Sequence, residues 1–212
     1  MTDGFTVASL RWAIDRFSEK LRLSADELNS LDGALGDGDL GVNLLRAAER
    51  LKSEAPNLPD DLGMALVKCA QAFTGVSAST YGTLLATGLM AAARLTRGNF
   101  SVPWSGLSSL LAAALQSMSD RGKGSLGDKT LLDAVEAARR GCEGQEDPAM
   151  MAAASVAAVA DAMDELRGRQ FRQGRARMFG AKGIGLDDPG MLAFKRIVES
   201  LLPGPPTGST GS

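Results

Sequence analysis

Three aspartates with glycines between them lie within eight residues: Asp32, Asp37 and Asp39. Three carboxylates this close repel one another, so they are tolerable together mainly when a hard divalent cation neutralises them. An amphipathic run follows Asp39 directly, and the N-terminus of a helix is a natural place to hold phosphates. The spacing therefore predicts a magnesium site, with these three side chains as ligands, that faces a polyphosphate.

Other interpretations of this segment are weaker. A turn whose acids only cap the next helix is one alternative, but capping needs one acid and not three. An EF-hand is excluded, because the twelfth position counted from Asp37 is Ala48 and the bidentate acid is missing. The segments 36–41 and 122–127 both match G-x-G-x-x-G, but no strand precedes either, so they do not indicate a dinucleotide fold.

Two further segments could contact a nucleotide. Residues 74–80 are small or carry hydroxyl groups, which suits either close approach to a nucleotide or an ordinary capped turn, and both interpretations stay open. Residues 167–182 contain five arginines and one lysine without an acid. Such a run is usually a solvated face. Here it precedes the turn 185–190, which could fold an arginine over phosphates.

Composition excludes several classes of function. The net charge of −2 gives no reason to expect nucleic acid, and the chain has no histidine to act as base, metal ligand or phosphohistidine. Cys69 and Cys142 lie far apart, which favours two reduced thiols over a disulfide. We see no signal peptide and no apolar run of membrane-spanning length, so we expect a cytoplasmic protein.

The elements that must position these residues are helices. Nearly every segment has helical hydrophobic periodicity, and no alternating run is long enough for a convincing strand. One helix is expected at 7–22 and a second from Ser24, where Glu27 completes a capping box. Further helices are expected after the acids, and near 60–73, 79–96, 104–120, 130–140, 147–170 and 190–202. Glycines gather in four connecting loops, at 33–41, 74–82, 122–127 and 180–190. We predict one all-α domain over 1–202 and a tail, 203–212, that is flexible by composition.

The motifs occur together, and in the same order, in a known family. The chain resembles DhaL, the nucleotide-binding subunit of dihydroxyacetone kinases, over about residues 31–190. The matching pieces are Leu31-Asp32, Gly36-Asp37-Gly38-Asp39, Gly41-x-Asn43, Tyr81-Gly82-Thr83, Gly127-Asp128-Lys129-Thr130 with Asp133, Gly174-Arg175-Ala176, Ile184-Gly185 and Asp188-Pro189-Gly190. Each piece is short, but the ordered set is specific.

The resemblance implies an antiparallel barrel of about eight helices with the nucleotide at one end. It implies two Mg2+ ions, held by the three aspartates, and ADP or ATP. Arg175 is the candidate catalytic residue, for stabilising phosphate charge. The positions that match nucleotide contacts are Leu40, Gly41, Val42, Asn43, Val76, Ser77, Gly122, Leu131, Arg175, Asp188, Pro189 and Gly190.

The resemblance also implies partners. The chain would be a phosphotransferase subunit, active only with a K subunit that holds dihydroxyacetone or a related short ketose through a histidine. Some members use ATP directly, and in others a phosphohistidine M subunit of the sugar phosphotransferase system recharges the bound ADP. The oligomeric state is left open, with a homodimer among the options.

The chain departs from the family pattern at two places, and two alternative functions stay open. The family commonly has histidine where this chain has Leu40, and the loop 74–80 is less rich in glycine than usual. One alternative function is a non-catalytic, nucleotide-dependent regulatory module of the same fold. The other is a helical bundle that carries an apolar ligand in its core, with the acids serving only as a cap.

Overall fold

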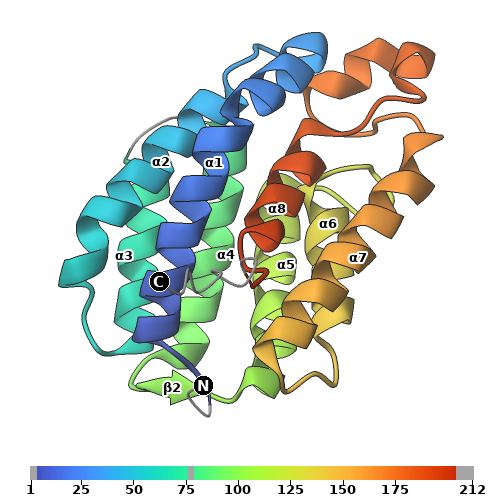
Figure 1. Cartoon of the computed structure of the whole chain (residues 1–212). Coiled ribbons are helices and arrows are strands. Elements are labelled where there is room, and N and C mark those ends of the chain that lie inside the picture. Colours follow the sequence, from blue (N-terminus) through green and yellow to red (C-terminus); the bar gives the residue numbers. More distant parts are fainter. Residues whose placement is uncertain (1–3, 76–78, 204–212) are drawn as a thin grey trace, which may run out of the picture.

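The computed structural model describes residues 4–75 and 79–203, and helices dominate this part of the chain (Figure 1). The eight α-helices are α1 (Val7–Leu35), α2 (Leu40–Glu54), α3 (Leu62–Thr74), α4 (Thr80–Thr96), α5 (Leu107–Gly122), α6 (Leu131–Cys142), α7 (Pro148–Arg167) and α8 (Pro189–Glu199). Three 3-10 helices, η1 (Ala55–Asn57), η2 (Trp104–Gly106) and η3 (Arg175–Gly183), lie between them. Two-residue strands β1 (Phe5–Thr6) and β2 (Ser101–Val102) pair antiparallel. The all-α prediction is confirmed, whereas Val76 and Ser77 lie outside the described residues.

Consecutive helices run in opposite directions and pack side by side (Figure 1). The last helix, α8, packs against both α1 and α7, so the ends of the series meet and the layer of helices closes into a barrel. The connections that follow α1, α3, α5 and α7 must then share one end of this barrel, which we call the loop end. The four glycine-rich loops predicted from the sequence belong to these four connections. The fold therefore brings together segments that are far apart in the chain.

The helix expected to begin at Ser24 is wrong. A single helix, α1, runs without interruption from Val7 to Leu35, and Ser24 is buried in its middle. The N-cap of α1 is Thr6, whose hydroxyl accepts from the N–H of Ser9. Ser24 and Glu27 match a capping box in type, but no glycine or proline stops the helix before them, so the backbone continues through both. The carboxylate of Glu27 instead pairs with Arg196 of α8.

A large apolar cavity lies inside the barrel. Its volume is about 760 Å3, and its lining includes Phe17, Cys69, Phe73, Leu89, Met118 and Phe194. Among the described residues, the three aspartates are not part of that lining. The cavity and the acids are therefore separate features of the molecule.

Small side chains make the close helix packing possible. Alanines of α3, α4 and α6 are buried in the core, where their size lets neighbouring helices approach. In the part of the chain that the structure describes, no helix combines the length and the hydrophobicity needed to cross a membrane.

The closest approach of α2 to α1 is at Gly41. A Cβ atom built on Gly41 would lie 2.0 Å from the carbonyl oxygen of Ala25, which is backbone and cannot rotate away. We therefore expect Gly41→Ala to destabilise the fold by about 1–3 kcal/mol or more, because the helices must separate. Gly106→Ala is the control, since a Cβ there meets no atom within 4 Å. Urea denaturation of the two variants measures the difference, and equal stabilities would contradict the packing of α1 on α2.

Candidate metal and phosphate site

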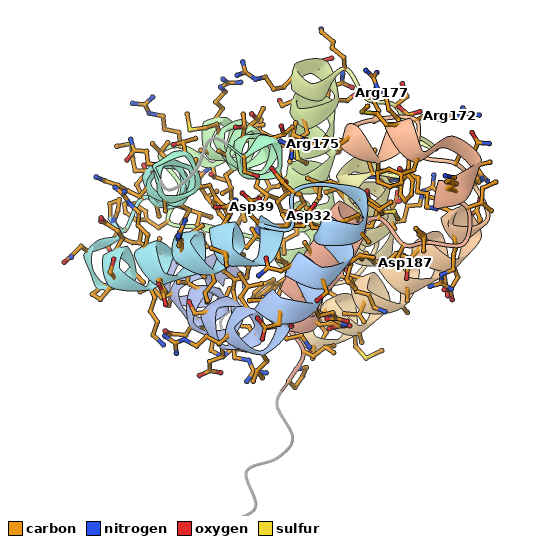
Figure 2. All side chains as sticks on the ribbon, turned by 90° about the horizontal axis from the view of Figure 1, so that it is seen from above. Asp32, Asp39, Arg172, Arg175, Arg177 and Asp187 are labelled. Atoms are coloured by element: carbon orange, nitrogen blue, oxygen red, sulfur yellow. The ribbon has the colours of Figure 1, made fainter. Side chains whose placement is uncertain are left out.

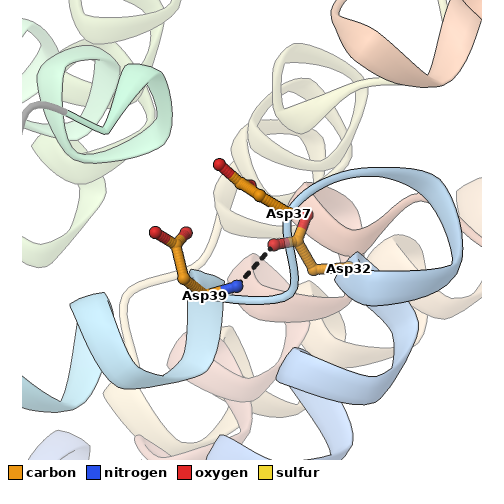
Figure 3. Close-up of side chains that lie close together, drawn as sticks. All are labelled: Asp32, Asp37 and Asp39. Atoms are coloured by element: carbon orange, nitrogen blue, oxygen red, sulfur yellow. Dashed lines mark hydrogen bonds between the residues drawn. The ribbon is translucent and has the colours of Figure 1, made fainter.

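The three aspartates converge where α1 ends and α2 begins (Figure 3). Asp32 lies in the last turn of α1, Asp37 lies in the connection, and Asp39 is the N-cap residue of α2. One carboxylate oxygen from each lies within 4.8 Å of the other two. Asp32 is half-buried, whereas Asp37 and Asp39 are exposed. We call these three side chains the acid cluster.

The three acids differ in whether they cap α2. One oxygen of Asp32 accepts from the N–H groups of Asp39, at 3.0 Å, and Leu40, at 3.2 Å. The side chain of Asp39 stands at the N-cap position but makes no capping hydrogen bond. Of the three acids, only Asp32 therefore caps α2, and capping does not account for Asp37 and Asp39.

Asn29 belongs to the site and was missed by the sequence analysis. It lies one turn before Asp32 on α1, and its side-chain oxygen accepts from the N–H of Val42 at 3.1 Å. The N–H of Asn43 donates to the carbonyl of Asp39. Of the amides of Gly41, Val42 and Asn43, which open α2, only that of Gly41 therefore has no partner among the described residues. Asn29 lies three residues before Asp32, and residues three apart share one face of a helix. This spacing was the sequence signal that could have identified Asn29. The positive charge of a bound cation and of Arg175, more than free amides, would therefore have to attract an anion to this site.

Arg175 reaches the acid cluster from the other side of the loop end (Figure 2). It begins η3, and its guanidinium forms an ion pair with the carboxylate of Asp37. The hydrogen bond from Arg175 holds the pKa of Asp37 below its ordinary value. Both side chains are exposed, so the pair can open without loss of core packing. The sequence placed Arg175 and Asp37 in one site although 138 residues separate them.

Other predicted contact residues differ in what they can offer. The side chains of Leu40 and Leu131 are buried in the hydrophobic core, so only their backbones are available to a ligand. Leu40 donates its N–H to Asp32, while its side chain packs in the hydrophobic core. Gly122 ends α5 at the loop end, and Asp188, Pro189 and Gly190 begin α8 there.

A second group of ionisable side chains surrounds the start of α8. Asp188 is the N-cap of α8 and accepts from the N–H of Met191 at 2.7 Å. Burial of its carboxyl group raises the pKa of Asp188 to about 7, and the nearby Asp133 adds to the rise while Lys129 opposes it. The hydroxyl of Tyr81 is buried near Asp188 without a hydrogen-bond partner among the described residues, and burial raises its pKa too.

The raised pKa of Asp188 makes stability depend on pH. The folded protein holds this proton more tightly than the unfolded chain, so the contribution of Asp188 to stability falls as the pH rises from about 4 to about 7. Compared with Asp188→Asn, which keeps an acceptor for Met191, the wild type should lose on the order of 2–3 kcal/mol between pH 5 and pH 8. Urea denaturation at several pH values measures this. Parallel curves for the two proteins would show that Asp188 titrates normally.

The acid cluster fits a hard divalent cation. Its donors are all carboxylate oxygens, and with no histidine in the chain and no cysteine in the cluster it suits magnesium better than zinc. Oxygens bound to a single Mg2+ lie about 3–4 Å apart, so rotation of the exposed Asp37 and Asp39 side chains would close the present spacing. The donor set can therefore hold the cation without a change in the backbone.

Known proteins resemble this chain over most of its length. The sequence pattern of the DAK2 domain matches residues 34–203. The chain is 29% identical over 199 residues to the ADP-binding subunit DhaL of the PEP-dependent dihydroxyacetone kinase 1 of Listeria innocua, a match that covers 92% of this chain and 94% of that protein. It is 27% identical to the corresponding subunit of the PEP-dependent dihydroxyacetone kinase of Escherichia coli, over 89% of this chain and 92% of that one.

Solved structures share the fold. The dihydroxyacetone kinase of C. freundii in complex with AMP-PNP and Mg2+ superposes with a TM-score of 0.73 at 23% identity. The match covers 93% of this chain but only 34% of the kinase chain. The present chain thus spans about a third of that protein and corresponds to one of its parts.

Proposed function

The chain belongs to the DAK2 domain family, and from that premise we propose that it is the nucleotide-binding subunit of a kinase for dihydroxyacetone or a related short ketose. It binds Mg2+ and ADP or ATP at the loop end and supplies the phosphoryl group to a substrate held by a partner. One observation carries this proposal: the acid cluster, the start of α2 and Arg175 meet at the end of the barrel where four connections converge.

Asp32, Asp37 and Asp39 hold the metal in this proposal. Mg2+ usually takes one or two protein carboxylates and completes its shell with water and phosphate oxygens. One oxygen of Asp32 already accepts from two N–H groups, which leaves its other oxygen for a metal. Three carboxylates are still more than one Mg2+ usually takes, so they suit two ions better than one. When bound, the ions neutralise the phosphates and polarise the transferring group.

In this proposal Arg175 is the side chain of the protein that supplies positive charge to the phosphates. Its pairing with Asp37 shows that its guanidinium reaches the acid cluster. With Asp37 holding a metal ion, Arg175 would be free to donate to phosphate oxygens instead. Charge that develops on the transferring group is stabilised by a donor already in place.

Two residue types that could hold or deprotonate a ketose are not available in this chain. It has no histidine, and burial raises the pKa of both cysteine thiols, that of Cys69 to about 12. In this proposal the base that accepts the substrate proton is on the partner, a K-type subunit. Exposed apolar side chains around Arg175, among them Met178, Phe179 and Ile184, provide a surface on which such a partner can dock.

Two arrangements could recharge the bound nucleotide. Both relatives named above are PEP-dependent kinases, which favours a bound ADP rephosphorylated by a phosphohistidine M-type subunit. Direct exchange of ATP is the other arrangement. A reducing cytoplasm, in which both cysteines remain thiols, is the setting we propose for either.

Calorimetry with ADP tests the proposal. We expect ADP to bind when Mg2+ is present and binding to be lost when EDTA removes the metal. Before the titration, denaturing the purified protein and identifying any released nucleotide distinguishes retained ADP from exchange of ATP. Binding of ADP that is equally tight with and without Mg2+ would contradict the metal-bridged site, and binding without transfer to a partner would favour the regulatory alternative.

A further inference from the structure

Lys129 is the largest fully buried side chain in the described part of the molecule, and the function proposed above does not use it. It lies just before the N-cap of α6, and 1% of its surface is exposed. Its backbone has φ 64°, a left-handed conformation that is uncommon for a residue with a side chain. A buried ammonium on unusual backbone requires compensation from its surroundings.

Backbone carbonyls and an aromatic ring provide that compensation. The Lys129 ammonium donates to the carbonyl oxygens of Arg169 at 2.9 Å, Arg167 at 3.2 Å and Gly183 at 3.3 Å. It also lies 4.1 Å from the ring centroid of the buried Phe171. Among the described residues, no carboxylate forms an ion pair with it. All three donors of the ammonium are therefore used on one stretch of backbone.

That stretch is a loop whose two ends Lys129 holds together. Arg167 and Arg169 lie where α7 ends, and Gly183 ends η3, so the loop from 167 to 185, here called the arginine loop, leaves and returns at the same point. The N–H of Gly185 donates to the carbonyl of Arg167 at the same neck. A Cβ on Gly183 would lie 2.6 Å from the ring of Phe171, so the ring and this backbone are in close contact.

Beyond the neck the arginine loop is weakly held. From Arg172 to Lys182 no residue is buried. The described hydrogen bonds that tie this part to another loop are from the N–H of Arg172 to Asp128 and from the side chain of Gln173 to Lys123, both in the connection that ends at Lys129. Arg175 lies in this exposed part, and its ion pair with Asp37 reaches across to α1.

We propose that Lys129 is a positioning residue, an internal latch that closes the neck of the arginine loop and thereby places Arg175 against the acid cluster. The described contacts of the Lys129 ammonium are with backbone carbonyls and Phe171, and none is with the acid cluster. It acts by fixing where the loop begins and ends, which limits how far Arg175 can move from Asp37. The effect of Arg175 on nucleotide then depends on Lys129.

Lys129→Met, which keeps the length of the side chain but removes the ammonium, tests the latch without any ligand. Hydrogen exchange of the peptide covering 168–185 should rise about tenfold or more, while exchange in α2, α3 and α4 stays unchanged. Lys182→Met, an exposed lysine of the same loop, is the matched control and should leave exchange unchanged. Lys129→Gln, which keeps two donors, should fall between wild type and Lys129→Met. Unchanged exchange in the loop, or a rise throughout the barrel in both Lys129 variants, would overturn the latch.

A double-mutant cycle tests whether the latch acts through Arg175, and this arm rests on the proposed function. The affinity for ADP in the presence of Mg2+ should fall about 5- to 30-fold in Lys129→Met, and the double variant with Arg175→Met should be within about twofold of Arg175→Met alone. Additive losses would overturn the proposal. If the wild type binds no ADP, the proposed function fails, and the exchange measurement decides the role of Lys129 by itself.

Discussion

Asp37→Asn is expected to lower the affinity for ADP in the presence of Mg2+ at least about 100-fold, while the helical fold persists. Loss of a partner that only orients a metal ligand costs about 10- to 100-fold, and Asp37 is a ligand itself in our proposal. Asparagine has the same size but no charge. It also leaves the capping of α2 intact, since Asp32 provides that capping.

The control for this experiment lies on the same helix as Asp32. Asp15 of α1 is an exposed acid paired with Lys52, away from the acid cluster. Asp15→Asn should bind ADP like the wild type, since exposed ion pairs contribute little. Circular dichroism and urea denaturation show whether both variants are folded. An Asp37→Asn protein that is folded and binds ADP with wild-type affinity would remove Asp37 from the metal site.

Arg175→Met should produce changes of opposite sign in two measurements. Phosphoryl transfer, assayed with the partner subunit, should fall about 1,000-fold, the lower range for loss of an arginine that stabilises the transferring phosphate. Affinity for Mg2+ alone should instead rise by up to about fivefold, because the guanidinium no longer competes for Asp37. A residue with a purely structural role would not separate the two quantities in this way.

Arg177→Met is the matched control, because Arg177 lies two residues further along the same 3-10 helix and is also exposed to solvent. Figure 2 labels both arginines. It should change neither transfer nor Mg2+ affinity by more than about twofold, as expected for a surface side chain. Equal losses in both variants would mean that the general positive charge of the loop matters, and not the placement of Arg175.

The sequence predicted that the three aspartates lie close together, because their proximity is a local property of the chain. Three carboxylates within eight residues of the chain are expected to lie near one another, so the acid cluster was predicted from spacing alone. Helical periodicity predicted the class of fold, and the order of the motifs identified the family. The four glycine-rich loops converge because helices of alternating direction put every second connection at one end.

Local pattern could not show which polar groups are already occupied. Asp39 has the position of a capping residue, yet Asp32, seven residues earlier, accepts the N–H groups at the start of α2. Ser24 and Glu27 have the types of a capping box inside an uninterrupted helix. In each case tertiary packing decided between local options of similar energy.

The burial of Lys129 by residues distant in the chain also could not be predicted from the sequence. Lys129 follows an aspartate in a glycine-rich connection, where a lysine is ordinarily solvated. Its role is visible only when residues 167–169 and 183 are brought around it, about 40 to 50 residues away in the chain. The sequence analysis predicted the arginine that faces the acids, but not the lysine that holds its loop.

The most direct test of the metal-bridged site is a crystal grown with ADP and Mn2+ in place of Mg2+, with diffraction recorded at the manganese absorption edge. We expect anomalous density between the carboxylates of Asp32, Asp37 and Asp39, in contact with the phosphates of ADP, and the guanidinium of Arg175 turned from Asp37 toward those phosphates. Nucleotide bound at the loop end with no anomalous density among the three aspartates would contradict the account.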